Sequence, residues 1–141
     1  ITALDSHGEP VGFTATSLAS FSAVPPRASF NIAQHASSYR SVGIGARVLL
    51  HFLAGHQVEI ARIMAGPAAQ RFEGDHWSAD DRGLPRLTGV RAVLEAHVVA
   101  VTEVGDNASV IVEIDGGDTN VECAPLVYVE RRYHAVGDVV D

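Results

Sequence analysis

The sequence predicts a mainly β protein, a β-barrel that carries two or three short helices. Seven or eight short stretches are apolar or alternate with polar residues, whereas only one stretch has clear helical periodicity. Hydrophobic residues make up 47% of the 141 positions and charged residues only 19%, which is typical of a packed globular chain. A chain of this length usually builds one core, so residues 1–141 are predicted to form a single domain.

Apolar runs of strand length alternate with turn residues along most of the chain. In the first half, Gly8 and Pro10 form a turn between two short strands, and Pro25-Pro26 breaks any regular pairing before the next one. In the second half, the turn residues Gly105-Asp106-Asn107 join two long runs. The strands predicted with bounds are residues 1–4, 27–33, 48–53, 91–103, 108–114 and 126–129.

Helices are predicted at three places between these strands. The clearest covers residues 55–65, where apolar residues recur on one face and Gly66-Pro67 ends the helix. Two shorter helices are predicted at residues 37–45, which end at a glycine, and at residues 68–72. Residues 75–83 are polar and are predicted to form a loop.

Charge and cysteine content exclude several classes of function. All ten basic residues are arginine, and the net charge of -7 argues against binding to nucleic acid, which depends on clustered cations. No apolar run approaches the ~20 residues of a membrane span, and Cys123 has no partner for a disulfide. We therefore expect a cytoplasmic protein that does not bind membranes. Because Ile1 already reads as strand, we also expect an N-terminal helix and part of the first strand to be absent.

The familiar motifs of metal sites and of covalent catalysis do not occur. The seven histidines form no His-Glu-x-x-His pattern, so no metal site is predicted. The nucleophile elbow Gly-x-Ser-x-Gly and the dinucleotide fingerprint Gly-x-Gly-x-x-Gly are also missing.

A run of small, hydroxyl-bearing residues is the most informative local feature. It contains Thr14, Thr16, Ser17, Ser20 and Ser22, and Ser37-Ser38 follows at a predicted helix start. Small residues let a planar ligand approach the backbone, and hydroxyls at a helix N-terminus can hold a phosphate without lysine. The alternative interpretation is structural, because threonine favours strands and Ser37 is a suitable helix cap.

The order of these segments resembles the flavin reductase-like family of FMN-binding split barrels. The likeness rests on Gly12-Phe13-Thr14-Ala15-Thr16-Ser17 with the hydroxyl run after it, on Pro25-Pro26, and on Ala36-Ser37-Ser38-Tyr39. It continues through Arg71-Phe72-Glu73-Gly74 and covers nearly the whole chain.

The resemblance implies a split β-barrel that acts as an NAD(P)H:flavin oxidoreductase. FMN, or FAD in its place, would be the cofactor, and NADH or NADPH would be the reductant. Family members are homodimers, and many supply reduced flavin to a flavin-dependent monooxygenase. Hydride transfer is the chemistry of the two cofactors, so the absence of a catalytic triad is expected. The alternative is a flavin-binding split barrel without efficient reductase activity, which would act as a flavin carrier or an interaction protein.

Site residues follow from the same resemblance, position by position. The flavin ring and its side chain would contact the hydroxyl run and the strand after it, and Ser37 and Ser38 would hold the phosphate. Asn107 and Tyr133 are the candidate catalytic positions, and Phe72 and Asn107 would lie on the nicotinamide side. The cofactor-binding candidates are Thr14, Ala15, Thr16, Ser17, Asn31, Ala33, Gln34, His35, Ser37 and Ser38.

Four positions depart from the family pattern. Asn107 replaces a histidine associated with pyridine-nucleotide binding, and asparagine cannot titrate or carry a positive charge. Val112 replaces a glycine, His51 replaces a strand asparagine, and Gln34-His35 stands where the phosphate turn commonly has a basic residue and serine.

Overall fold

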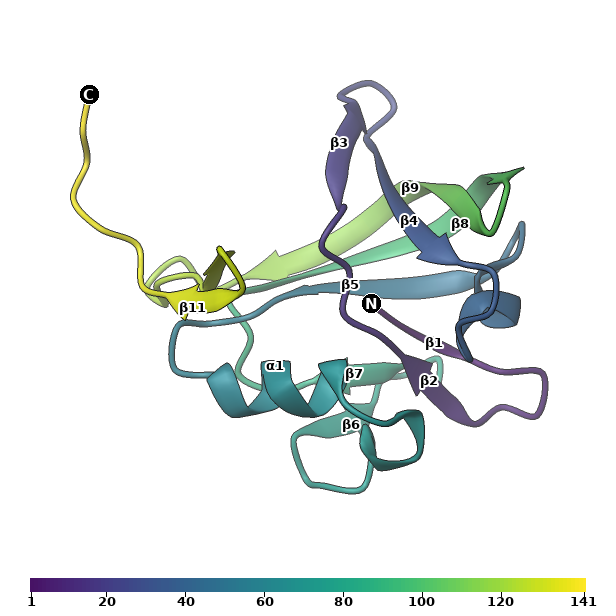
Figure 1. The fold of residues 1–141 in the computed structure, drawn as a ribbon, viewed down its shortest axis with the longest axis horizontal. Coiled ribbons are helices and arrows are strands. Elements are labelled where there is room, and N and C mark those ends of the chain that lie inside the picture. Colours follow the sequence, from purple (N-terminus) through teal and green to yellow (C-terminus); the bar gives the residue numbers. More distant parts are fainter.

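The fold is built on one antiparallel sheet of seven strands, described for all residues 1–141 by a computed structural model. The strand order is β2-β1-β5-β8-β9-β4-β3 (Figure 1). The strands are β1 (Thr2–Leu4), β2 (Pro10–Gly12), β3 (Ala19–Ser22), β4 (Arg27–Ala33), β5 (Arg47–Phe52), β8 (Ala92–Val104) and β9 (Asn107–Thr119).

The sheet curls around a core but its ladder is not closed. Strands β2 and β3 are its two edges and share no backbone pairing. Residues 13–18, called here the crossing segment, run from the end of β2 to the start of β3 and so span the opening between these edges (Figure 1). The mainly β architecture predicted from the sequence is confirmed, and Thr14, Thr16 and Ser17 of the hydroxyl run lie in the gap, whereas Ser20 and Ser22 belong to β3.

Strand alternation places the main core on one face of the sheet. Phe30 and Ile32 of β4 lie opposite Val110 and Ala108 of β9, and all four are buried. The two faces of β5 are both covered, because Leu49 belongs to a second, smaller core with Leu84 and Val93. The remaining buried members of the main core are Ala3, Val42, Val48, Leu50, Ala96, Val98 and Val112.

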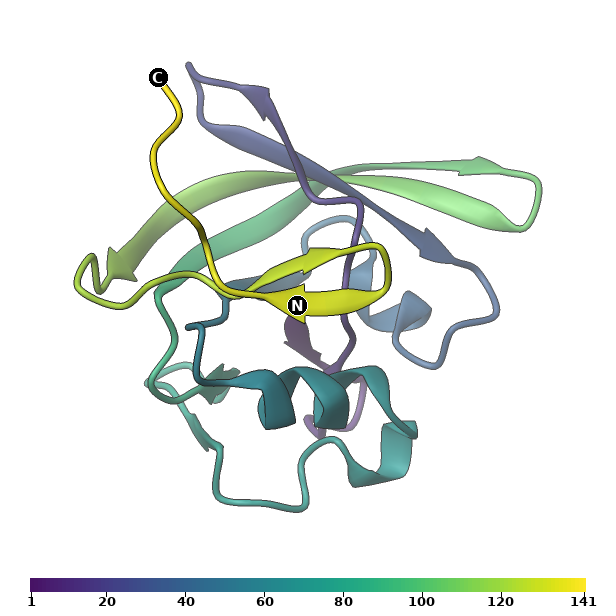
Figure 2. The ribbon, with the colours of Figure 1, turned by 60° about the vertical axis from the view of Figure 1, so that its left-hand side comes forward.

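The one α-helix lies at the bottom of Figure 1 and Figure 2, below the strands of the β8–β9 hairpin. Helix α1 (Val58–Ala65) buries Ala61 and Met64, and Gly66 follows its last residue. The predicted helix at 55–65 is therefore real but begins three residues later. None of the helices has the length and apolar character needed to cross a lipid bilayer.

Two predicted helices are shorter than expected. The segment 37–45 forms only the 3₁₀ turn η1 (Tyr39–Val42), and 68–72 forms the 3₁₀ turn η2 (Ala68–Gln70). Gly43 and Gly45 disfavour continuation of the helix after η1, whereas no residue explains why the second segment forms only η2.

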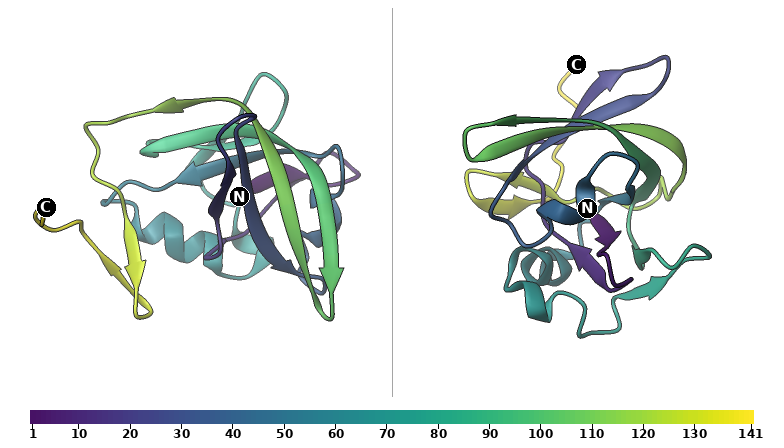
Figure 3. Two further views of the ribbon diagram at one scale, coloured as in Figure 1. Left: turned by 90° about the horizontal axis from the view of Figure 1, so that it is seen from above. Right: turned by 90° about the vertical axis from the view of Figure 1, so that its right-hand side faces the viewer.

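Two small hairpins lie outside the main sheet. Strands β6 (Trp77–Ala79) and β7 (Pro85–Leu87) pair across the region predicted as the loop 75–83, so that prediction was wrong for residues 77–79. Strands β10 (Val127–Val129) and β11 (Arg132–His134) form the second hairpin, which stands apart from the sheet (Figure 3). Strand β10 falls within the predicted strand 126–129, whereas β11 was not predicted.

Candidate functional site

The crossing segment points its small polar side chains outward. Phe13, Ala15 and Leu18 pack against the main core, and the rings of Phe13 and Phe30 lie 5.8 Å apart. Thr14 and Thr16 alternate with these residues and are exposed, and neither hydroxyl has a hydrogen-bond partner within the protein. The segment therefore presents two free hydroxyls at the opening of the sheet, anchored by apolar neighbours.

Ser17 is used differently from the two threonines. Its Oγ accepts a hydrogen bond from the backbone N–H of Asn31 at 2.8 Å and lies 3.5 Å from the Asn31 carbonyl oxygen. These contacts lie beyond the last backbone pair between β3 and β4, Ala19 with Ser29. The Ser17 hydroxyl thus continues the ladder with a side chain and fixes the crossing segment against β4.

The outward face of β4 and β9 brings three predicted site residues together. Ala33 is the cross-strand partner of Asn107, and Asn31 is the partner of Ser109. These residues alternate with buried positions, so they share the face opposite the core. Directly paired residues have Cβ atoms about 4.5–5.5 Å apart. The residues predicted for the flavin on β4 and the residue predicted for the nicotinamide on β9 are therefore neighbours.

The turn after β4 carries unpaired backbone donors. The backbone N–H groups of His35, Ser37 and Ser38 donate to no group of the protein. His35 and Ser37 are exposed, whereas Ser38 is buried. Clustered backbone N–H groups in a turn are suited to an anion. The Ser38 side chain points the other way, because it is buried and its Oγ donates to the carbonyl of Gly12 at 3.3 Å. Ser38 caps η1 without a side-chain hydrogen bond.

A junction at Gly12 joins this turn to the chain after α1. The Gly12 carbonyl also accepts a hydrogen bond from Arg71 Nη1 at 2.5 Å, and Arg71 Nε donates to the carbonyl of Gly66 at 3.0 Å. Partial burial lowers the pKa of the Arg71 guanidinium below its ordinary value. Arg71 thus ties the end of α1 to the first residue before the crossing segment. Its position in Arg71-Phe72-Glu73-Gly74 was noted in the sequence, but its structural role was not.

Phe72 lies at the same junction. A Cβ built on Gly12 would come within 3.0 Å of Phe72 Cζ, so the phenyl ring is packed against the start of the crossing segment. The indole N–H of Trp77 donates to the Phe72 carbonyl at 2.9 Å, and the two rings meet edge to face with centroids 5.4 Å apart. The structure therefore places Phe72 beside Gly12, at the start of the crossing segment.

Tyr133 is not brought to these residues within one chain. It lies on β11, and its ring packs on Tyr128 of β10 with centroids 4.9 Å apart. The hairpin that carries both tyrosines stands apart from the crossing segment (Figure 3).

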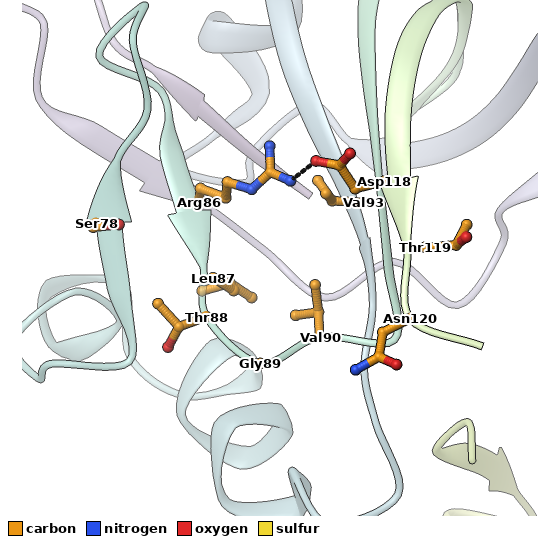
Figure 4. Close-up of a pocket in the computed structure, with 10 residues that line it drawn as sticks. All are labelled: Ser78, Arg86, Leu87, Thr88, Gly89, Val90, Val93, Asp118, Thr119 and Asn120. Carbon is orange, nitrogen blue, oxygen red and sulfur yellow. Dashed lines mark hydrogen bonds and ion pairs between the residues drawn. The ribbon is translucent and has the colours of Figure 1, made fainter. Parts of the chain in front are cut away.

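A separate pocket lies between β7 and the far end of β9 (Figure 4). Its volume is about 380 Å³, and none of the predicted site residues lines it. Arg86 at its edge pairs with Asp118 and lies 3.7 Å from Glu95, so its charge is already compensated. Elsewhere, no group of three or more His, Cys, Asp or Glu residues is arranged to hold a metal ion.

Comparison with known proteins identifies what this arrangement is similar to. The model of the flavin reductase like domain matches residues 1–137. An NADH:FMN oxidoreductase of Rhodococcus qingshengii is 37% identical over 95% of this chain and 72% of its own length. The reductase component of a flavin-dependent trigonelline monooxygenase of Acinetobacter baylyi is 30% identical over 94% of this chain and 43% of its own. The crystal structure of a flavin reductase domain protein from Arthrobacter sp. FB24 superposes with a TM-score of 0.90 at 33% identity, covering 99% of this chain and 87% of that one.

Proposed function

This chain belongs to the flavin reductase like domain family, and we propose that it is an NAD(P)H-dependent flavin reductase. Residues 1–141 would act as one flavin-binding unit, with FMN as the first candidate cofactor and NADH or NADPH as the hydride donor. The relatives named above support the class of reaction, and the arrangement of residues on the outward face of β4 and β9 supports the location of the site.

One observation carries the proposal: the outward face of β4 and β9 joins the flavin candidates to the nicotinamide candidate. Asn31 and Ala33 lie beside Ser109 and Asn107, and Ser17 fixes the crossing segment against the same stretch of β4. Hydride transfer needs the two rings held close together, and positioning alone can supply about 7–11 kcal/mol of the barrier. When bound, the flavin would accept the hydride, and the protein would orient it and exclude water.

The free hydrogen-bonding groups of the site fit a flavin with a phosphate. Thr14 and Thr16 offer hydroxyls to the polar edge of the ring, with the apolar Ala15 between them. The unpaired N–H groups of His35, Ser37 and Ser38 offer an anion three donors, and the Ser37 hydroxyl adds a fourth. This arrangement requires no lysine, which agrees with a chain in which all ten cations are arginine.

We infer that the working form is a homodimer that hands reduced flavin to a monooxygenase. The β10–β11 hairpin exposes half of Tyr128 and half of Val129, and an isolated hairpin is marginally stable in water. A second copy would cover this surface and could complete the site with Tyr133. The Acinetobacter relative is the reductase component of a monooxygenase, which supports the partner class. We propose a cytoplasmic location, because the cytoplasm supplies NADH and is reducing, which agrees with the free thiol of Cys123.

The proposal is tested by adding FMN to the purified protein. At 100 times its dissociation constant, FMN should stabilise the fold by ~2.7 kcal/mol, and it should change the fluorescence of the only tryptophan, Trp77. Oxidation of NADH or NADPH that depends on added FMN then distinguishes a reductase from the alternative, a passive flavin carrier. Absence of any FMN-dependent stabilisation would contradict both.

The location of the site is tested with matched threonine variants. Replacing Thr14 and Thr16 by valine keeps their shape and removes both hydroxyls, so FMN affinity should fall about tenfold. Thr119→Val removes an equally exposed hydroxyl at the far end of β9 and should leave affinity unchanged. Equal effects of the two changes would argue against binding at the crossing segment.

A further inference from the structure

Gln34, the first residue after β4, donates hydrogen bonds to both residues of the β8–β9 turn, Gly105 and Asp106, and to Asn107 at the start of β9. Its backbone N–H donates to the carbonyl of Asp106 at 2.9 Å. Its side-chain Nε2 donates to the carbonyl of Gly105 at 2.8 Å and to the carbonyl of Asn107 at 3.1 Å. Each residue of the turn therefore accepts one hydrogen bond from the same neighbour.

These bonds use all the donors that the Gln34 amide has. A primary amide carries two N–H bonds, and both point at backbone carbonyls here. The side chain is then left with an acceptor oxygen only, which would repel a phosphate. The Gln34 side chain therefore has no free donor for a phosphate, and a direct contact with the cofactor would have to use its acceptor oxygen.

The β8–β9 turn is closed by the cross-strand pair Val104 and Asn107, and β4 holds it from the other side. The ladder between β4 and β9 ends at the pair Ala33 and Asn107, so Gln34 is the last attachment of the turn to β4. Gly105 has φ +56°, a conformation that favours glycine, in a two-residue hairpin loop. The side chain of Asn107 is exposed and makes no hydrogen bond, so its direction depends on its backbone, which is held by pairing with Val104 and Ala33 and by the Gln34 amide.

We infer that Gln34 is a positioning residue that aims Asn107 at the nicotinamide and thereby determines affinity for the hydride donor. The inference rests on the proposed function, because it needs Asn107 to face the nicotinamide. Gln34 lies between the turn with free N–H groups and the β8–β9 turn. Its hydrogen bonds go to the β8–β9 turn. Loss of the Gln34 amide should therefore weaken binding of the nicotinamide hydride donor. Binding of FMN should be retained, because the hydroxyl and N–H groups proposed to bind it are unchanged.

The test replaces Gln34 by methionine, which keeps the length of the side chain and removes both donors. We expect KM for NADH to rise about tenfold, with kcat and the dissociation constant of FMN each within about twofold of the parent. The backbone N–H of residue 34 should exchange with solvent faster, because its bond to Asp106 loosens. Gln70→Met is the control, since Gln70 is exposed and its side chain makes no hydrogen bond.

A double variant separates positioning from a general loss of structure. If Gln34 acts through Asn107, then Gln34→Met should change KM little in a chain that already carries Asn107→Ala. Additive effects on KM, or a change in FMN affinity as large as the change in KM, would overturn the inference. Wild-type protein that oxidises no nicotinamide with FMN present would overturn the proposed function and the inference together. An active wild type with an unchanged KM in Gln34→Met would overturn the inference alone.

Discussion

Gly12 concentrates several constraints of the site in one residue without a side chain. A Cβ at this position would lie 2.9 Å from the carbonyl oxygen of Ile1 and 3.0 Å from both Met64 Cε and Phe72 Cζ. Its own carbonyl receives hydrogen bonds from Ser38 and Arg71. Gly12 is therefore where the first residue of the chain, α1, the turn after β4 and the segment after η2 meet, immediately before the crossing segment.

Gly12→Ala should destabilise the protein by about 1–3 kcal/mol, because the added methyl group overpacks this junction and one neighbour is backbone. Urea unfolding measures the loss, and FMN affinity should fall with it as the crossing segment shifts. Gly43→Ala is the matched control. Gly43 has φ -70° and open space around its Cβ position, so this change should be neutral or slightly stabilising. A stable Gly12→Ala protein would contradict the packing described.

Arg40 follows the turn that carries the unpaired N–H groups of His35, Ser37 and Ser38. It is exposed, lies two residues after Ser38 and has no carboxylate partner. We predict that Arg40→Ala weakens FMN binding about three- to tenfold and leaves riboflavin binding unchanged, because riboflavin lacks the phosphate. Arg82→Ala removes another exposed, unpaired arginine and serves as control. Titration followed by Trp77 fluorescence measures the affinity for each ligand. An equal loss of affinity for FMN and for riboflavin would exclude a contact between Arg40 and the phosphate.

The sequence predicted which residues lie at the proposed site better than it predicted the hydrogen bonds that their side chains make. The threonines of the crossing segment are as exposed as a ligand-binding role requires, and Asn31 and Asn107 share one face. Ser38 was predicted to hold a phosphate, yet its hydroxyl is buried on Gly12. Which way a serine or glutamine side chain turns depends on tertiary neighbours far along the chain, and one sequence contains no signal for those contacts.

At the scale of elements, His51 links β5 to β7 through one nitrogen. Its Nε2 accepts a hydrogen bond from the backbone N–H of Leu87 at 3.1 Å, while Nδ1 is buried without a partner. This bond requires the neutral ring. Burial accordingly lowers the pKa of His51 from 6.5 to about 3.

This linkage predicts a loss of stability in acid. The unfolded chain binds a proton at His51 near pH 6.5 and the folded chain only near pH 3, so the free energy of unfolding falls as pH drops below 6.5. Each unit of pH can remove up to about 1.4 kcal/mol until the folded pKa is reached. His51→Gln keeps an acceptor for Leu87 but does not titrate, so its stability should fall by about 1–2 kcal/mol less between pH 7 and pH 5. Parallel curves for the two proteins would show that His51 does not titrate in this way.

Elements with their own sequence pattern were predictable, and elements defined by a partner were not. Strand β4 matches the predicted residues 27–33 because prolines precede it and apolar residues alternate through it. Strands β6 and β7 have three residues each and exist through pairing with one another, among polar residues that suggested a loop. Strand β9 extends past the predicted residue 114 to Thr119, through a polar, glycine-containing end that β8 holds in register.

At the scale of the whole molecule, the open ladder leaves the crossing segment and the outer face of β4 and β9 accessible for the proposed site. A closed barrel would pair β2 with β3 and bury the backbone between them, whereas here the crossing segment fills that place with exposed threonines. The core on the inner face holds the strands, and the outer face of β4 and β9 remains available for a ligand. Apolar side chains are also exposed at one edge of the sheet and on the separate β10–β11 hairpin. These are Phe21 and Val24 near β3, and Tyr128 and Val129 on β10.

This exposed apolar surface leads to a prediction about assembly. Light scattering should give about 30 kDa, twice the 14.9 kDa of one chain. Val129→Arg places a charge on the half-exposed face of β10 and should shift the mass toward 15 kDa, because burying an unpaired guanidinium in an interface is costly. Ile44→Arg alters an equally apolar, 75% exposed residue in the loop before β5 and should keep the dimer. If Tyr133 serves a site shared between subunits, dissociation should also lower reductase activity, although the monomer remains folded in the absence of FMN. A parent protein of 15 kDa would contradict the dimer and assign Tyr133 a role within its own hairpin.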